Sequence, residues 1–275
     1  MKNSTVECPC CKKSFGEISH TYKSPPKGET KFDINYENYL RSYWKCGCCG
    51  HESSVHKLDL RNLYSNEYTE KTYGESVSDK FSKIISLPEN KSDNSFRVKR
   101  IVKFAKNYFH KKSVHTLLDV GFGLGVFPYS IKKNTDWNCW GIDPDKKSCE
   151  HLKNIIDVKI INDDFLKTNI KNLQKFDIIT LNKVIEHIEN PILMLKKAND
   201  LLKDDGFIYI EVPDVAASNE GYHREEFFIE HYHVFSPQSL IISCERAGLK
   251  FIELERIREP SSKFTIVSFF KKGFL

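Results

Sequence analysis

Three glycines at alternate positions follow an apolar segment that ends in an acid. The stretch TLLDVGFGLGVF, residues 116–127, places Gly121, Gly123 and Gly125 directly behind Asp119. Glycines let the backbone bend sharply and remove Cβ atoms where a ligand must touch the main chain. The spacing is neither that of the G-x-G-x-x-G dinucleotide fingerprint nor that of a P-loop, which ends in Gly-Lys-Ser/Thr. The turn predicts a site for a nucleotide-like cofactor.

Further acids lie at the ends of the next two predicted strands. Asp143 comes 22 residues after Gly121, where its carboxylate can accept both hydrogen bonds of a ribose diol. Asp163 or Asp164 is placed to accept from an adenine amino group, and Phe165 can pack on the base. Three strand ends thus offer complementary contacts to one adenosine.

Six of the nine cysteines fall in two clusters, at residues 8–11 and 46–49. Each cluster holds a C-x2-C pair in a turn-forming context, so that two thiolates can converge on one ion. The pairs predict a structural zinc site with four thiolate ligands: Cys8, Cys11, Cys46 and Cys49. Each cluster has one extra thiol and two histidines follow, which leaves these alternative ligands: Cys10, Cys48, His51 and His56. The alternatives to a metal are reduced thiols or disulfides, and a cytosolic location disfavours disulfides.

From residue 96 onward, segments of strand length alternate with segments of helix length. Strands are expected at residues 116–120, 138–142, 158–161, 176–181, 207–212, 250–256 and 264–270. Helices are expected at residues 96–109, from the glycine turn through 129, and at 144–155, 191–202 and 237–247. This alternation predicts a mainly parallel sheet with helices on both faces. Such a sheet binds ligands at the C-terminal ends of its strands, where the glycine turn and the acids lie.

The chain of 275 residues, 40 % of them hydrophobic, is long enough for one large domain with a small appendage. We expect a zinc-binding module at residues 1–60, a connector at 61–95 and the α/β domain at 96–275. The polar stretch 86–95 is the best linker candidate. Without a metal, the first 60 residues would have little core of their own.

The net charge of +5 comes from 42 basic and 37 acidic residues, with opposite signs mixed along most of the chain. This mild bias is not a nucleic-acid footprint. The densest basic run, from Arg97 to Lys112, is interpreted as a solvated helix face, the alternative being contact with a phosphorylated ligand or RNA. No apolar run resembles a signal peptide or a membrane span, so we expect a cytoplasmic protein with no membrane span.

The combined motifs resemble those of the class I S-adenosylmethionine (SAM)-dependent methyltransferases over about residues 98–270. The matching pieces are LLDVGFGLG, GIDPD, NDDF, FDIITLNKVIEHIENP and LKDDGFIYIEVPD. The resemblance implies a Rossmann-like α/β fold with seven strands in the order 3-2-1-4-5-7-6. The seventh strand would be antiparallel, and FTIVSFF would form it.

The same resemblance implies a set of cofactor-binding residues. Asp119 would lie near the methionine ammonium, the three glycines against the cofactor, and Asp143 with Pro144 at the ribose. The residues after strand four would line the cofactor: Asn182, Lys183 and Val184. Phe122 departs from the family, which often has a small or polar residue there, so its ring is expected over the cofactor or at the mouth of the site.

The N-terminal half resembles a subgroup that carries a zinc-binding module before the catalytic domain, including C-methyltransferases of deoxysugar nucleotides. CPCC, CGCCG and the following LYSNEY carry this resemblance. It implies a small-molecule acceptor, either a sugar nucleotide or a surface-glycan precursor. Another zinc-bearing relative methylates a guanine of ribosomal RNA, but it uses closely spaced cysteines with a histidine, whereas about 34 residues separate the pairs here.

Carbon and hydroxyl acceptors need a base, and the insertion after strand five, YHREEFFIEHYHVFS, lies where the family places its acceptor pocket. His231 is the predicted general base, with Glu230 orienting it or sharing the proton. Tyr222 in the same insertion and His187 in VIEHIENP complete the predicted catalytic set. The alternatives are a scaffold turn for the insertion and a structural role for His187. Two connector tyrosines would reach over the acceptor: Tyr68 and Tyr73.

Two other functions stay open. An RNA methyltransferase would use the zinc module to grip its substrate, and its affinity would fall steeply with salt. A non-catalytic module would bind SAM without turnover. The intact acids Asp119 and Asp143 and the three glycines argue against a dead cofactor pocket.

Overall fold

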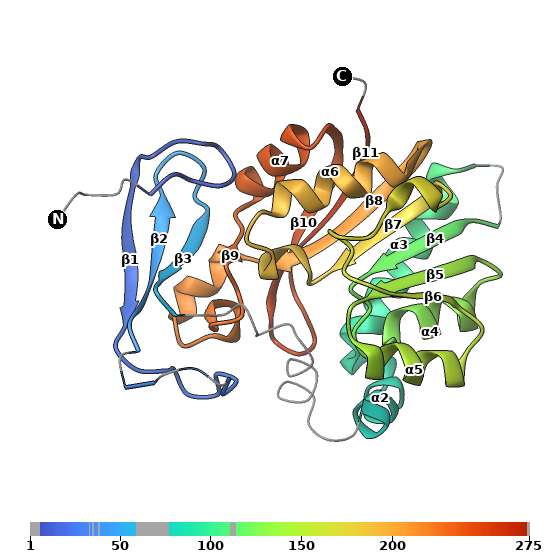
Figure 1. The fold of residues 1–275 in the computed structure, drawn as a ribbon, viewed down its shortest axis with the longest axis horizontal. Coiled ribbons are helices and arrows are strands. Elements are labelled where there is room, and N and C mark those ends of the chain that lie inside the picture. Colours follow the sequence, from blue (N-terminus) through green and yellow to red (C-terminus); the bar gives the residue numbers. More distant parts are fainter. Residues whose placement is uncertain are drawn as a thin grey trace.

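Two β-sheets lie side by side in the computed structural model, which describes residues 6–32, 34, 36–37, 39–58, 77–110 and 114–273 (Figure 1). The larger sheet has seven strands and carries the glycine turn, and the smaller has four strands. No helix among the described residues has the length and apolarity to cross a membrane.

The seven-stranded sheet has the order β10-β11-β8-β7-β4-β5-β6. Its strands in chain order are β4 Thr116–Val120, β5 Asn138–Asp143, β6 Lys159–Asn162, β7 Phe176–Asn182, β8 Leu202–Pro213, β10 Leu249–Arg258 and β11 Phe264–Lys272. Neighbours pair in parallel except at β11, which is antiparallel to both β8 and β10. Numbered within this sheet, the order is 3-2-1-4-5-7-6 with an antiparallel seventh strand, so the predicted fold class is confirmed.

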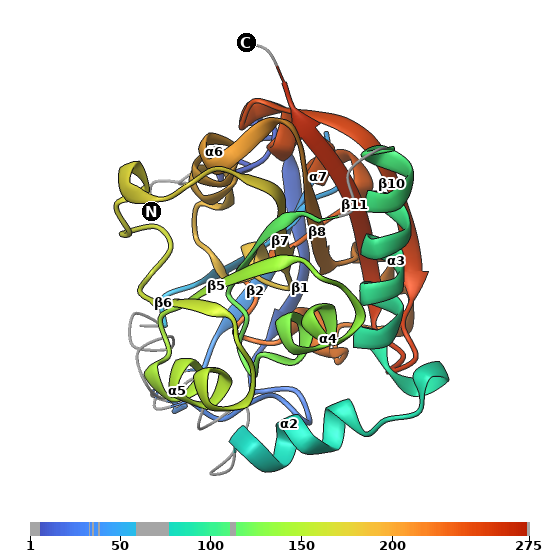
Figure 2. The same cartoon turned by 90° about the vertical axis from the view of Figure 1, so that its right-hand side faces the viewer.

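Helices cover both faces of the large sheet (Figure 2). One face carries α3 Asp93–Tyr108, α4 Val126–Asn134 and α5 Lys146–Ile155, and the other carries α6 Pro191–Leu201 and α7 Pro237–Arg246. Because successive side chains of a strand point to opposite faces, Leu117 packs with the first group and Leu118 with the second. Both leucines are fully buried, so the sheet lies in the middle of the core.

A side-chain cap sets the start of α3. The Ser92 hydroxyl accepts a hydrogen bond from the Ser95 amide, so the helix begins at Asp93 rather than at the predicted residue 96. The predicted linker therefore includes the first turn of α3. The region before it contains two further helical elements: α2 Val77–Ile85 and η1 Glu89–Lys91.

The small sheet is antiparallel, with the order β1-β2-β3-β9. The N-terminal region supplies β1 Gly16–Tyr22, β2 Arg41–Cys46 and β3 Glu52–His56, whereas β9 His233–Val234 comes from the insertion after β8. Glu52 pairs with Val234 and Ser53 with His233. The N-terminal region and the insertion thus share one sheet, while the division of the chain into three domains stays a prediction.

A buried ion pair fastens the insertion to this small sheet. Arg41 Nη2 lies 2.8 Å from Glu29 Oε2, and both side chains are buried. Arg41 Nη1 donates to the Phe227 carbonyl, and Glu29 Oε2 accepts from the Ile229 amide. Removing either charged partner would leave the other buried without its counterion, so the pair fixes residues 227–229 against the N-terminal region.

Candidate active site

The glycine turn depends on the absence of side chains. Gly121, Gly123 and Gly125 have φ angles of 69°, 52° and 75°, in the left-handed region that favours glycine. A Cβ atom on Gly121 would lie 2.9 Å from Val184 Cγ2, and one on Gly125 would lie 2.7 Å from Leu152 Cδ1. Both the backbone angles and the close packing therefore require glycine.

Asp143 lies beside this turn at the end of β5. Its Oδ2 atom accepts from the Gly123 amide at 2.8 Å, and its Oδ1 atom accepts from the Asp145 amide at 2.9 Å. Burial raises the pKa of the carboxyl to about 6. An ionised carboxylate has about four acceptor positions, and the two backbone amides occupy two of them. The Asp143 carboxylate can therefore still accept hydrogen bonds from a ribose diol.

Asp119 and Asn182 meet at the ends of β4 and β7. Asp119 Oδ1 accepts from Thr180 Oγ1 at 2.6 Å and from Asn182 Nδ2 at 2.9 Å. Burial raises the pKa of Asp119 to about 7. Among the described residues, the buried Oδ1 atom of Asn182 has no hydrogen-bond partner. The pair therefore offers acceptor oxygens for a donor that comes from a ligand.

The two residues after Asn182 point in different directions. Val184 packs over Gly121. Lys183 has a left-handed φ of 59°, and its Nζ atom lies 2.8 Å from Glu259 Oε1 at the turn between β10 and β11. Lys183 also donates to Thr265 Oγ1. Its side chain is thus engaged by the β10–β11 hairpin and not by the glycine turn.

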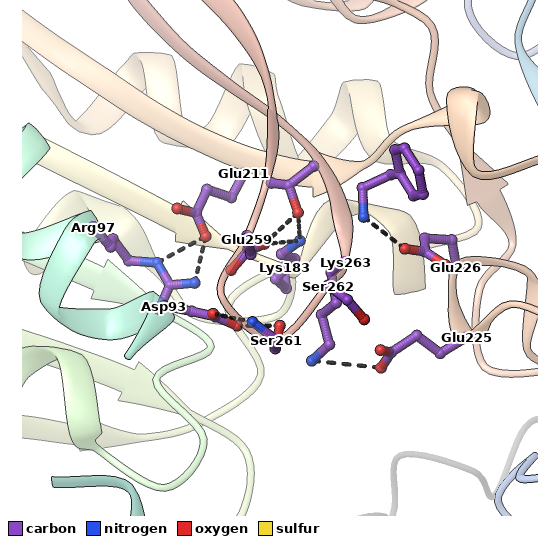
Figure 3. Close-up of polar contacts among 12 residues, drawn as sticks. Asp93, Arg97, Lys183, Glu211, Glu225, Glu226, Glu259, Ser261, Ser262 and Lys263 are labelled. Atoms are coloured by element: carbon purple, nitrogen blue, oxygen red, sulfur yellow. Dashed lines mark hydrogen bonds and ion pairs between the residues drawn. The ribbon is translucent and has the colours of Figure 1, made fainter. Parts of the chain in front are cut away.

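The tip of the β10–β11 hairpin joins three parts of the molecule (Figure 3). Beyond Lys183 and Glu259, Ser261 Oγ donates to Asp93 Oδ2 of α3 at 2.6 Å. Lys263 Nζ lies 3.4 Å from Glu225 Oε2 of the insertion. The hairpin therefore holds the loop after β7, the start of α3 and the insertion in fixed relation.

Replacing Glu259 with glutamine should lower the free energy of unfolding by about 2 kcal/mol at pH 7, because Lys183 loses its buried counterion. Burial would raise the pKa of Glu259, but the charges of Lys183 and Arg97 outweigh it and lower the pKa to about 2. The stabilisation is present above the ordinary pKa of 4.5 and is lost as the pH falls towards 2.

Urea unfolding of the wild type and of Glu259→Gln at pH 7 and pH 3 measures this difference. The exposed Glu255 on the same hairpin provides the matched control Glu255→Gln, which should unfold like the wild type. A difference in unfolding free energy between wild type and Glu259→Gln that is the same at pH 7 and pH 3 would contradict the assignment.

The residues predicted at the adenine end differ in exposure. The Asp163 amide donates to the Asp143 carbonyl, so the two strand ends lie together. The Asp163 carboxylate accepts from Thr168 Oγ1 at 2.7 Å, and that of Asp164 accepts from the Leu166 amide at 2.9 Å. Pro144, which follows Asp143, is exposed, whereas the ring of Phe165, which follows Asp164, is buried in the core.

The Phe122 ring is also buried. It packs with Cys149 and Leu152 of α5, and a Cβ atom on Gly141 of β5 would lie 2.7 Å from Phe122 Cδ1. The ring therefore fills the space between the glycine turn and β5. Its predicted contact with the cofactor stays a prediction.

Two histidines predicted as catalytic are brought together from distant parts of the sequence. The rings of His187, in η3 Ile185–His187, and His231 have centroids 4.8 Å apart. Nδ1 of His187 donates to the Glu230 carbonyl and Nδ1 of His231 donates to the Glu226 carbonyl, both at 2.9 Å. Burial lowers the pKa of His187 to about 4 and that of His231 well below its ordinary value. Both rings are thus neutral imidazoles near pH 7.

Sequence reasoning did not select Glu186, which precedes His187. Its carboxylate is fully buried, and neither oxygen has a hydrogen-bond partner among the described residues. Burial raises its pKa to about 8. One ligand atom from each of Glu186, His187 and His231 lies within 4.8 Å of the others. The available signal was an acid beside a histidine immediately after a buried strand.

The two remaining predicted catalytic residues occupy different surroundings. Glu230 contributes its backbone carbonyl to His187, and burial raises the pKa of its carboxyl to about 7. Tyr222 donates to Glu52 Oε2 at 3.0 Å and stacks on His20, so the structure engages it with the small sheet. The connector tyrosines lie outside the described residues: Tyr68 and Tyr73.

Four sulfur atoms gather beside α7, whose N-cap Ser236 donates to the Cys49 carbonyl and whose last residue Arg246 donates to the Cys10 carbonyl. The Sγ atoms of the predicted ligands lie within 4.8 Å of one another: Cys8, Cys11, Cys46 and Cys49. The Sγ atoms of Cys8 and Cys49 lie 3.5 Å apart, as do those of Cys11 and Cys46. In a tetrahedral site with Zn–S bonds of about 2.3 Å, the sulfur atoms are about 3.8 Å apart, so the observed distances are close to those of a zinc site. The alternative ligand His51 instead contacts His233 and Ser239. The donor set therefore fits one tetrahedral zinc ion.

Comparison with known sequences identifies related proteins. The family described as "Methyltransferase domain" matches residues 91–254. A ubiquinone biosynthesis O-methyltransferase of Glaesserella parasuis serovar 5 (strain SH0165) is 33 % identical over 126 residues, which is 42 % of this chain and 51 % of the relative. An (S)-coclaurine N-methyltransferase of Papaver somniferum is 29 % identical over 151 residues, which is 51 % of this chain and 42 % of the relative. The chain spans about half the length of these two curated relatives.

Solved structures share the fold. The plantazolicin methyltransferase BpumL, in complex with a triazolic desmethylPZN analog and SAH, gives a TM-score of 0.57 at 15 % identity and covers 78 % of this chain and 98 % of its own. A S-adenosylmethionine-dependent methyltransferase from Clostridium acetobutylicum ATCC 824 gives 0.56 at 12 % identity, with 72 % and 100 % covered. At these identities the likeness concerns the fold alone.

Proposed function

Because this chain belongs to the class I SAM-dependent methyltransferases, we propose that it transfers a methyl group from SAM to a small-molecule acceptor. The observation that carries the proposal is the set of acceptor oxygens beside the side-chain-free glycine turn. Three strand ends of one sheet supply this set, as the binding of an adenosine with an amino-acid tail requires.

The residues present fit SAM. The methionine ammonium would supply the donor that Asn182 Oδ1 lacks, with the Asp119 carboxylate beside it. Asp143 would hold the ribose diol, and Asp163 would accept from the adenine amino group. When bound, SAM supplies a methyl group attached to a positively charged sulfur. An electron pair of the acceptor forms the new bond to this methyl carbon while the carbon–sulfur bond breaks, which leaves S-adenosylhomocysteine.

The acceptor side is formed by the two neutral imidazoles. In each ring the Nδ1–H group donates to a backbone carbonyl, so the lone pair belongs to Nε2. His231 Nε2 would take the proton of a hydroxyl or carbon acceptor, and His187 would orient the acceptor beside it. Glu230 supports the pair through its backbone carbonyl.

Replacing His231 with alanine should lower turnover at least about tenfold, the low end of what a general base contributes, while SAM affinity stays nearly unchanged. Turnover and the SAM dissociation constant are measured on one preparation. The exposed His223 in the same insertion gives the matched control His223→Ala, which should retain wild-type turnover. Normal turnover in His231→Ala would remove this residue from the mechanism.

For the acceptor we propose a sugar nucleotide or a surface-glycan precursor. Support comes from the cysteine centre and from the insertion that shares a sheet with the N-terminal region. A labelled-methyl transfer screen against sugar nucleotides, glycan precursors, phenols, amines and RNA tests this choice, with zinc content measured on the same sample. Transfer to phenols or amines alone would overturn the sugar proposal and keep the methyltransferase proposal. Transfer to none of them would overturn both.

We also propose that the four clustered cysteines hold a structural zinc ion. Four protein ligands leave no open position for water or substrate, so this ion would act on folding rather than on chemistry. The centre packs against α7, where Arg246 Nη1 donates to the Pro9 carbonyl at 3.0 Å. Zinc at this place would connect the first residues of the N-terminal region to the large domain.

A further inference from the structure

A second group of side chains that could hold a metal ion lies outside the cysteine centre. One ligand atom from each of Glu186, His187 and His231 lies within 4.8 Å of the others. The first two residues belong to the loop after β7, and His231 comes from the insertion after β8. A carboxylate and two imidazoles form the ligand set of several catalytic metal sites, in which a fourth position stays open.

The surroundings of the histidines match those of metal ligands. Metal-bound histidines almost always donate their other ring N–H to a carbonyl or carboxylate, which fixes the tautomer and the orientation of the ring. His187 and His231 both do so, through the carbonyls of Glu230 and Glu226. Because Nδ1 is the donor in each ring, Nε2 is the nitrogen that can coordinate an ion.

Glu186 supplies the independent observation. Its carboxylate is fully buried, and neither oxygen has a hydrogen-bond partner among the described residues. A buried acid without donors is costly unless a cation or a ligand satisfies it. The neighbouring Lys183 is engaged elsewhere, since its Nζ atom lies 2.8 Å from Glu259. An ion between the acid and the two rings would satisfy Glu186.

We propose that Glu186, His187 and His231 bind one divalent first-row transition-metal ion. Two of the three side chains are only partly buried, so the open position can face an incoming ligand. Resting on the proposed function, we assign this position to a hydroxyl or carbonyl oxygen of the acceptor. In the metal-bound protein Nε2 of His231 would coordinate the ion, and the ion would hold the acceptor oxygen. The role of His231 as a base, proposed above, then belongs only to the protein without this ion.

Titration with Co²⁺ tests the site without any acceptor. The full chain is stripped with a chelator and refilled, and its stoichiometry and visible absorption are recorded. Thiolate ligation gives sulfur-to-cobalt charge-transfer bands that a nitrogen and oxygen site lacks, so the two centres are distinguishable. The wild type should bind two ions, one with and one without these bands.

Matched variants identify the ligands. Glu186→Gln and His231→Ala should each weaken the thiolate-free site at least about 100-fold, since loss of even an outer-shell partner costs 10- to 100-fold. The exposed neighbour Glu189 gives the control Glu189→Gln, which should bind two ions like the wild type. Circular dichroism confirms folding, and the band-bearing cysteine site acts as an internal control in every variant.

One thiolate-ligated ion alone in the folded wild type would overturn the proposal, as would a second ion that both variants retain. SAM affinity, measured on the same samples, keeps the proposed function separate. Bound SAM with no second ion would overturn the metal site alone. Absence of SAM binding would overturn the proposed function, and the Co²⁺ titration would still decide the metal site independently.

Discussion

Replacing Asp143 with asparagine is expected to weaken SAM binding roughly 150-fold, or by about 3 kcal/mol. The carboxylate would accept both ribose hydroxyls, and hydrogen bonds to a charged group contribute about 1.5–3 kcal/mol each. The amide keeps the size of the side chain and one acceptor oxygen for Gly123, and it loses only the second hydrogen bond, from the Asp145 amide, so the glycine turn should persist. Isothermal titration calorimetry with SAM measures the change.

The exposed Asp157, in the turn before β6, provides the control for this substitution. Asp157→Asn removes the same charge at the opposite end of the neighbouring strand β6, away from the glycine turn, and should leave SAM affinity within about twofold of the wild type. An Asp143→Asn variant that binds SAM with wild-type affinity would show that the ribose lies elsewhere. The proposed cofactor site would then have to be abandoned.

Replacing Cys46 with serine is expected to release the zinc ion that we propose at the four cysteines and to unfold the small sheet. Zinc binding contributes about 10–16 kcal/mol in isolated zinc-finger peptides, far more than the hydrogen bonds that Arg246 donates to the Pro9 and Cys10 carbonyls in the first turn. Cys46 ends β2, so losing the ion frees the strand that carries Arg41. The insertion that Arg41 holds should loosen, and turnover should fall with it.

Zinc content, limited proteolysis and near-ultraviolet circular dichroism follow this change. Cys48 lies two residues away, is exposed and stands outside the sulfur cluster, so Cys48→Ser is the matched control. That variant should retain one zinc ion and the protease resistance of the wild type. If Cys46→Ser keeps its zinc and its resistance to protease, the four-thiolate assignment is wrong.

Local patterns and the family resemblance were sufficient to predict the large sheet. Alternating apolar segments identified its strands, and the resemblance supplied their order and the antiparallel FTIVSFF strand, which β11 confirms. The start of α3 was placed three residues late because Ser92 was not recognised as its cap. Such errors are small because helix ends depend on single hydrogen bonds.

Contacts between residues far apart in the chain could not be predicted from the sequence. Lys183 was expected at the cofactor, but its partner Glu259 lies 76 residues later, and nothing local indicates that the two charges meet. The pairing of β3 with β9 joins residues about 180 apart. Glu186 was missed because burial without a partner is a property of the folded chain, although the acid itself stands beside a selected histidine.

The β3–β9 pairing restricts how this chain could be recombined with its relatives. A chimaera that grafts residues 6–58 onto another methyltransferase, without the loop that contributes β9, would expose the backbone edge of β3 and strand the Arg41 guanidinium without its carbonyl acceptor. Exchange would succeed only when the cysteine-bearing segment and the loop that contributes β9 are transferred together. If the insertion lines the acceptor site as we propose, substrate choice and the N-terminal region would be inherited together.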